Sequence, residues 1–167
     1  MDQYDIRILT TDDWGKLHHI RIEMVRTNPE AFLENEEAAR ARPKEEWIKR
    51  LSSPISRHFG YFSGSQLVGL IGIFSHDKLP EDVLEIGMNF TSPAYRGKGL
   101  TTLGYKHCLI YAKSLTGYKE IHVSHREGNM ASRSAILKAG FEFQGYGTKT
   151  YGDNKESTSY NYIYKLK

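Results

Sequence analysis

The chain has 167 residues and a formal net charge of +3. This length suits one domain over residues 1–167, and so mild a charge does not indicate a nucleic-acid partner. Cys108 is the single cysteine, so no intrachain disulfide can form, in agreement with a reducing cytoplasm. The N-terminus carries acids where a signal peptide carries positive charge, and the longest apolar run, residues 67–74, is too short to span a bilayer. We therefore expect a cytoplasmic protein that binds neither membranes nor nucleic acid.

The first part of the chain predicts one strand followed by two helices. Apolar and polar residues alternate over residues 4–8, which is typical of a strand. Thr10 or Thr11 then caps a helix whose apolar residues recur at helical spacing, and Asn28 with the proline after it ends this helix. Pro43 predicts the start of the second helix.

The second part predicts six further strands, two helices and no repeat or linker. The strand over residues 67–74 is nearly all apolar, so we expect it to be buried on both faces. The remaining strands are expected over residues 58–62, 83–91, 121–125, 141–148 and 158–166, the last two as a hairpin. The helices are expected to begin after Gly97 and Gly99, and over residues 129–139.

The sharpest local signal is the glycine turn between the strand over residues 83–91 and the next helix. Gly97 and Gly99 let the backbone fold tightly and approach a ligand, and the N–H groups at the helix start can hold a pyrophosphate. Arg96 and Lys98 add positive charge. A P-loop is excluded because Lys98 is followed by glycine, and a dinucleotide fingerprint because position 102 is threonine. A solvated basic turn remains the alternative for this segment by itself.

The segment around this turn resembles the acetyl-CoA segment of the GNAT superfamily of N-acetyltransferases. The resemblance covers the strand Leu84-Glu85-Ile86-Gly87-Met88-Asn89-Phe90-Thr91 and the turn Ser92-Pro93-Ala94-Tyr95-Arg96-Gly97-Lys98-Gly99. Arg96 and Gly99 match the superfamily pattern, whereas Thr101 departs from its last small position. Asn129, followed after eleven residues by Gly140-Phe141, resembles the next helix of the family, and the element order is similar over nearly the whole chain.

The resemblance implies an α/β fold with a mixed, mostly antiparallel sheet, helices on both faces, and a splay between strands four and five. Acetyl-CoA is the implied co-substrate, with its pantetheine in the splay and its pyrophosphate on the glycine turn, and no metal is implied. A splayed pair of strands leaves N–H and C=O groups that need a partner, which agrees with such a site. The implied cofactor-binding residues are Phe90, Thr91, Arg96, Gly97, Lys98, Gly99, Leu100, Thr101 and Asn129.

Two residues are candidates for the chemistry of direct acetyl transfer. The acceptor amine, with an ordinary pKa of about 10.4, must lose a proton, and the leaving thiolate benefits from a donor. Glu85 stands where the histone acetyltransferase branch carries its catalytic glutamate, although it is equally readable as a solvent-facing strand carboxylate. Ile136 stands where many members carry a tyrosine acid. Ser132, one turn earlier on the same face, resembles the serine of ribosomal-protein acetyltransferases and is the candidate donor to the thiolate. The alternative for Ser132 is a small residue that only packs at the helix start. If Ser132 is not the donor, Tyr146 or water is the remaining candidate.

The acceptor is less well defined by the sequence. The acidic segment over residues 28–37 favours a cationic amine such as a polyamine, an amino sugar or a peptide N-terminus, unless it is only a solvated helix face. We expect an enzyme that transfers an acetyl group from acetyl-CoA to a primary amine of a small molecule, peptide or protein by direct attack in a ternary complex. A catalytically silent acyl-CoA-binding regulatory module is the alternative, and a homodimer is one option for the assembly.

Overall fold

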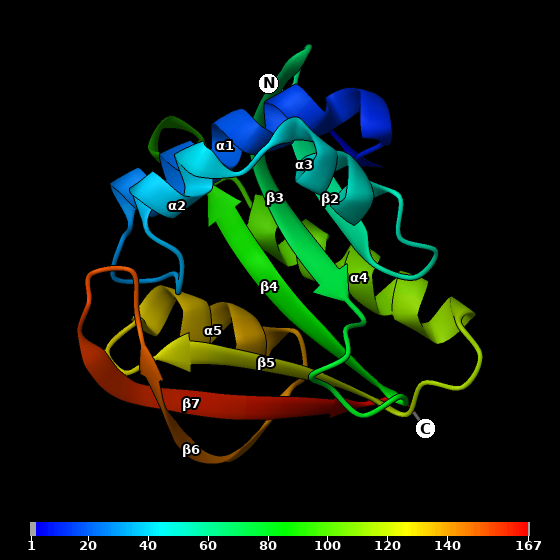
Figure 1. Ribbon diagram of the computed structural model, residues 1–167. Helices are drawn as coiled ribbons and strands as arrows, with labels where there is room; N and C mark the ends of the chain where they lie inside the picture. The colour runs from blue at the N-terminus through cyan, green and yellow to red at the C-terminus, as the bar shows by residue number, and fades with distance from the viewer. Residues whose placement is uncertain (1–2, 167) are drawn as a thin grey trace.

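In residues 3–166, which the computed structural model describes, seven strands form one sheet with helices on both faces (Figure 1). The strands are β1 (Tyr4–Ile8), β2 (Arg57–Ser63), β3 (Gln66–Phe74), β4 (Val83–Thr91), β5 (Glu120–Arg126), β6 (Glu142–Thr150) and β7 (Glu156–Lys165). The helices are α1 (Trp14–Thr27), α2 (Glu36–Ala41), α3 (Lys44–Leu51), α4 (Leu100–Ser114) and α5 (Met130–Lys138), with short 3-10 helices η1 (Thr11–Asp13) and η2 (Pro93–Tyr95).

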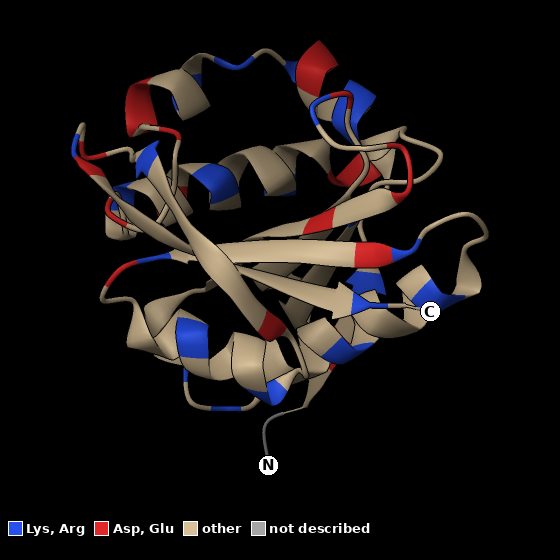
Figure 2. Ribbon diagram, turned by 90° about the horizontal axis from the view of Figure 1, so that it is seen from below, with Lys and Arg blue, Asp and Glu red and all other residues tan. Residues whose placement is uncertain are grey.

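The sheet has the order β1-β2-β3-β4-β5-β7-β6, and each neighbouring pair is antiparallel except β4 and β5, which are parallel. This confirms the expected mixed, mostly antiparallel sheet. Helices lie above and below the strands, and charged residues of both signs are interspersed along the chain (Figure 2). Within residues 3–166, no helix combines the length and the apolar character that crossing a membrane requires.

Two apolar layers hold the helices on the sheet. Ile71 and Ile73 of β3 lie in a core shared with α4 and α5, whereas Leu70 of the same strand lies in a second core shared with α1 and α3. All three side chains are fully buried, so β3 is covered on both faces as its apolar sequence predicted. This central strand fixes the position of β4 beside it.

The parallel pair β4 and β5 separates over most of its length. Pairing covers only Val83–Glu85 on β4 and Glu120–His122 on β5, so residues 86–91 have no partner on that side. Met88 has a positive φ of 54°, and the register between β3 and β4 shifts at the same point. Such a bulge bends the strand that carries it. The end of β4 therefore turns away from β5, as the diverging arrows of Figure 1 show, and the expected splay is confirmed.

Helix α2 is an element that the sequence analysis did not place. Residues 28–37 were interpreted only as an acidic segment, but Asn35 caps a helix of six residues by accepting a hydrogen bond of 2.8 Å from the Ala38 backbone N–H. Six residues are too few to show a helical period, and Ala39 is the buried residue of this helix. The N-cap asparagine was the available signal.

The loop between β6 and β7 contacts the loop that follows α1. The Gly152 N–H donates to the Phe32 carbonyl oxygen at 2.7 Å. A Cβ at position 152 would lie 2.6 Å from the Glu34 carbonyl oxygen, so only glycine allows the two loops to approach this closely. The C-terminal hairpin and the segment after α1 therefore meet beside the splay, on the left of Figure 1.

The first prediction concerns stability and pH. His58 on β2 is 2% exposed and its Nε2 has no hydrogen-bond partner. Burial, helped by the charges of Arg50 and Arg21, lowers the pKa of His58 from 6.5 to about 4. In the unfolded chain His58 therefore becomes protonated near its ordinary pKa, whereas in the folded chain it stays neutral until a lower pH. The contribution of neutral His58 to the free energy of unfolding is complete above the ordinary pKa. It is lost as the pH falls toward the pKa of His58 in the folded chain.

Urea denaturation measures this effect. Between about pH 7.5 and about pH 5 we expect the free energy of unfolding to fall by roughly 2 kcal/mol more in the wild type than in His58→Leu. An equal fall in both proteins would mean that His58 does not control the acid sensitivity of the fold.

Candidate active site

Two adjoining clefts open at the splay. The larger has a volume of 870 Å³ and follows the end of β4, the glycine turn and the start of α5. The smaller has a volume of 290 Å³ and continues between β4, β5 and the C-terminal hairpin. The residues that line both clefts are Ala31, Phe32, Asn89, Arg126, Asn129 and Ser132. The site is therefore divided into two spaces that meet where β4 leaves β5.

The glycine turn lies on the larger cleft, as expected. Gly97 and Gly99 have positive φ values of 76° and 79°, and a Cβ at either position would meet no atom within 4 Å. The two glycines are therefore required by the backbone conformation, and the space beside them is open. Gly99 is the N-cap of α4, and no side chain of the described residues caps this helix. Its first N–H groups are available to an anion, while the buried Leu100 anchors the helix in the core.

Arg96 fixes the turn to two other elements. Its Nε donates to the Thr91 carbonyl oxygen at 2.8 Å, and its Nη2 donates to Asn28 Oδ1 at 2.8 Å. The guanidinium also lies over the ring of Phe90, 5.7 Å from the centroid. Arg96 thus joins the turn to the end of β4 and the end of α1, whereas the exposed Lys98 lines the cleft.

The end of β4 presents alternating backbone groups to the splay. The Ser92 N–H donates to the Val68 carbonyl oxygen of β3 at 2.8 Å. Because an antiparallel ladder alternates, Phe90 also directs its N–H and C=O toward β3, and Asn89 and Thr91 direct theirs toward the open side. The Phe90 ring is buried against Phe32.

Unsatisfied polar atoms accompany these open backbone groups. The Asn89 Oδ1 and Thr91 Oγ1 atoms are both buried and lack a hydrogen-bond partner. Leaving such an atom unpaired costs about 1–3 kcal/mol, so a ligand that bonds to it recovers that cost. Both residues line the larger cleft, which fits an amide-bearing ligand lying along β4.

Helix α5 brings Ser132 to the place where the clefts meet. Asn129 caps the helix by accepting from the Ser132 backbone N–H at 3.2 Å, so its side chain has a structural role. The Ser132 side chain is half-buried and lines both clefts.

The expectation that Ile136 shares this cleft is wrong. Ile136 is fully buried in the core and lines neither cleft, and Ala135 is the residue that faces the larger cleft one turn after Ser132. Tyr146 is 67% exposed and lines neither cleft, so it is not placed to act as the fallback acid.

Glu85 lines the smaller cleft. It lies three residues before Met88, where β4 is still paired with β5. Its side chain is 42% exposed, and its Oε1 lies 3.3 Å from His76 Nε2. The carboxylate is therefore accessible to a small molecule in this cleft and is oriented by one imidazole.

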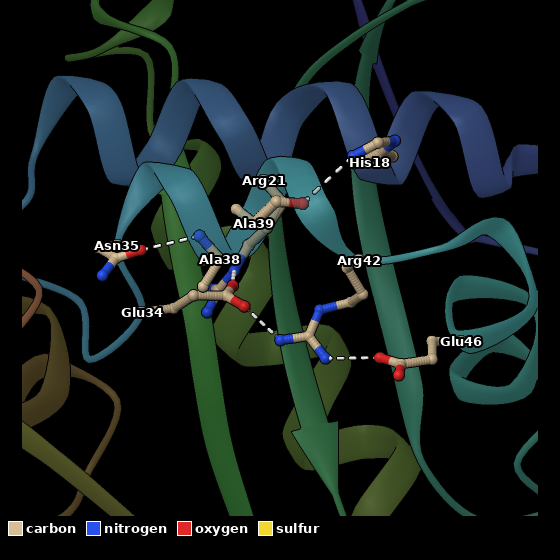
Figure 3. A network of polar contacts seen from close by, with 8 residues as sticks. All are labelled: His18, Arg21, Glu34, Asn35, Ala38, Ala39, Arg42 and Glu46. Atoms are coloured by element: carbon tan, nitrogen blue, oxygen red, sulfur yellow. Dashed lines mark hydrogen bonds and ion pairs between the residues drawn. The ribbon is translucent and has the colours of Figure 1, made fainter.

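The acidic segment after α1 lies beside the clefts: Glu30 is the acid of this segment that lines the larger cleft, whereas Glu34 lines neither cleft and is paired within the protein (Figure 3). Glu34 accepts a hydrogen bond of 2.7 Å from Arg21 Nε and another from Arg42, which also binds Glu46 at 3.0 Å. Burial raises the pKa of Glu34, but the bonds and charges of the two arginines outweigh it, so the pKa lies below its ordinary value. The carboxylate is ionised and neutralised within the protein.

The sequence analysis missed several residues of the smaller cleft. Arg126 Nη1 donates to Asp153 at 2.7 Å and to the Glu30 carbonyl oxygen at 3.0 Å, while Lys149 Nζ donates to Ser124 Oγ at 2.7 Å. These contacts join segments far apart in the sequence, so no local pattern indicates them. Tyr151 and Asn89 were also missed.

The histidines of β5 have protein partners. His122 lies 2.7 Å from Glu120, and His125 bonds to the hydroxyl of Tyr162 at 2.8 Å. Within residues 3–166, no group of three or more His, Cys, Asp or Glu residues is placed to hold a metal ion.

Comparison with known proteins identifies the family. Residues 5–142 match the model of the acetyltransferase (GNAT) domain. No curated protein matches the chain. The chain therefore belongs to the GNAT acetyltransferase family, and the resemblance seen in the sequence is confirmed.

Solved structures share the fold at low sequence identity. A GNAT-family acetyltransferase from Streptococcus pneumoniae has a TM-score of 0.81 and 16% identity, covering 99% of this chain and 100% of its own. The yncA protein of Salmonella typhimurium, solved with acetyl-CoA, has a TM-score of 0.80 and 15% identity, covering 98% and 94%. Spermidine N-acetyltransferase from Vibrio cholerae, solved with CoA and spermine, has a TM-score of 0.77 and 15% identity, covering 99% and 97%.

Proposed function

We propose that this GNAT acetyltransferase is an N-acetyltransferase that transfers an acetyl group from acetyl-CoA to a primary amine of a small molecule or peptide. The observation that carries the proposal is the pair of clefts that meet at Asn89 and Ser132. Two adjoining spaces can hold both substrates at once, which favours direct attack in a ternary complex.

In this proposal the larger cleft holds acetyl-CoA, which supplies the acetyl group as an activated thioester. The N–H groups from Arg96 to Thr101 bind the pyrophosphate, with the dipole of α4 behind them. The pantetheine amides bond to the backbone groups of Asn89 and to the Thr91 N–H, rather than to Phe90. The Asn89 Oδ1 and Thr91 Oγ1 atoms, which also lack partners, add two acceptors. Support comes from two proteins of the same fold that were solved with acetyl-CoA or CoA.

Glu85 is the proposed base for the acceptor amine. Three residues of strand separate it from the bulge at Met88, a distance of about 10 Å. A glutamate side chain does not cover that distance alone, so we propose that one water relays the proton. The contact of 3.3 Å with His76 holds the carboxylate toward the smaller cleft.

Ser132 is the proposed hydrogen-bond donor to the departing thiolate. It lies in the first turn of α5, where the helix dipole stabilises negative charge, and it lines both clefts. The missing tyrosine at position 136 favours the silent-module alternative, and Ser132, which lines both clefts, counts against it. A cytoplasmic location stays part of the proposal, since the lone Cys108 is compatible with reducing conditions.

The second prediction tests the anion site. Gly99→Glu and Gly99→Gln both suffer the strain of a positive φ, so the difference between them isolates the charge. We expect acetyl-CoA to bind at least tenfold more weakly to the glutamate variant, about 1.4 kcal/mol, by calorimetry. Equal affinities in two folded variants would exclude the pyrophosphate from this turn.

The third prediction tests the base. Glu85→Gln keeps the shape of the side chain and removes its basicity, so the rate should fall by roughly 10²–10⁴-fold. The acidic limb of the pH–rate profile should move or disappear with it. His19→Gln, at an exposed position on α1 that lines neither cleft, is the control and should keep the profile. A wild-type profile in Glu85→Gln would leave Glu85 with no part in proton transfer.

The fourth prediction tests the donor. A hydrogen bond to a charged group contributes about 1.5–3 kcal/mol, so Ser132→Ala should lower kcat by about tenfold to a hundredfold. Acetyl-CoA affinity should stay nearly unchanged, because the Asn129 cap bonds to the backbone of Ser132 and not to its hydroxyl. Ser134→Ala, exposed on the same helix, is the matched control. Unchanged kcat with chemistry rate-limiting would show that the thiolate leaves without Ser132.

A further inference from the structure

The smaller cleft carries two charges that the protein does not neutralise. Four of its lining residues are Arg21, Glu85, Arg126 and Lys149. The two arginines are paired, Arg21 with Glu34 and Arg126 with Asp153, both at 2.7 Å. Glu85 has only a histidine contact at 3.3 Å. Among the ion pairs of residues 3–166 none involves Lys149, whose ammonium bonds to the neutral hydroxyl of Ser124.

A half-buried ammonium without a carboxylate partner selects its ligand by charge. It attracts an anionic group and repels a second cation, so it disfavours polyamines in this cleft. The acidic segment that favoured a polyamine does not oppose this selection, because Glu34 is held by two arginines and Glu30 lines the larger cleft rather than this one.

Glu85 and the anchor of Lys149 lie at neighbouring positions of β4 and β5. Glu85 pairs in register with His122, and Ser124, which anchors Lys149, lies two residues further along β5. A strand spacing of about 4.8 Å and an advance of about 6.6 Å place the Cα positions of Glu85 and Ser124 about 8 Å apart. One small molecule in this cleft can therefore face both side chains, Glu85 through the relaying water.

The size and lining of the cleft restrict the rest of the ligand. Its 290 Å³ equal about ten water-sized volumes, which is close to the size of a single amino acid. The hairpin loop limits it further, because Gly152 bonds to Phe32 beside the cleft. The apolar residues that line the space are Phe32, Leu33, Phe74, Met88 and Val123.

We propose that the acceptor is a free α-amino acid with an apolar side chain, and that Lys149 determines this specificity by binding its carboxylate. The proposal rests on the N-acetyltransferase function proposed above and names the substrate class of the same site. Lys149 binds the carboxylate, the amine faces Glu85 and the bulge, and the side chain lies against the apolar wall.

The test compares each amino acid with analogues that lack its charge. Acetylation of leucine and phenylalanine is measured against isopentylamine, phenethylamine and leucinamide, with spermidine as the polycation. We expect kcat/KM for the amino acids to exceed that for the matched amines at least tenfold. Leucinamide is the sharper comparison, because its amine is less basic than that of leucine and loses its proton more easily. A preference for leucine over leucinamide therefore reports the carboxylate.

Variants of Lys149 test its part in this preference. In Lys149→Met the ratio of kcat/KM for leucine to that for isopentylamine should fall at least tenfold, mainly through KM for leucine, while Lys149→Arg restores most of it. Lys106→Met, at an exposed lysine of α4 that lines neither cleft, should keep the wild-type ratio.

Two kinds of failure are distinguishable. Acetylation of spermidine and isopentylamine without preference for the amino acids, or a preference that survives Lys149→Met, would overturn the substrate class and leave the N-acetyltransferase function intact. Acetyl-CoA binding without acetylation of any amine would overturn both.

Discussion

The site depends on one backbone irregularity, the bulge at Met88. A methionine at a φ of 54° occupies a region that residues with a side chain rarely adopt, at a cost of order 1–3 kcal/mol. The bulge bends β4 away from β5 after three paired residues, so the strand that is fixed on β3 becomes open on its other edge. The cleft for one ligand begins beyond the bulge, at Asn89 and Thr91, and the second cleft lies before it, at Glu85. The strain at one residue thus divides the site into two spaces.

The segments around the splay of β4 and β5 are connected by arginines from distant parts of the chain. Arg96 joins the glycine turn to the end of α1, and Arg126 joins β5 to the loop between β6 and β7. Arg21, at the other side, holds Glu34 in the segment after α1. Each arginine bonds to an acid or a carbonyl of a segment beside the clefts. In the smaller cleft these contacts pair both arginines with carboxylates, whereas Glu85 and Lys149 have neither an arginine nor a carboxylate as partner among the ion pairs of residues 3–166.

The parts of this arrangement that local sequence encodes were predictable. Alternation and apolar runs located the strands, and Gly97 and Gly99 located the turn, because a positive φ at two positions before a helix is a local requirement. The bulge at Met88 was not predictable, since the residue is an ordinary strand former and only the divergence of β4 from β5 demands its conformation. The burial of Ile136 was missed for a related reason. The family pattern assigns that position to the cleft, whereas the packing of α5 in this chain turns it into the core.

The separation of Glu85 and Lys149 has a physical consequence for the proposed acceptor. Near a protein surface the attraction between two opposite charges in one open cleft is too weak to draw the side chains together against their own hydration and rotamer entropy. The side chains of Glu85 and Lys149 therefore stay apart, although both line the same small cleft. A zwitterion placed between them satisfies both, since its ammonium faces the carboxylate and its carboxylate faces the ammonium. Loss of the ammonium proton then leaves an anion bound to Lys149, which holds the neutral amine at the bulge while it reacts.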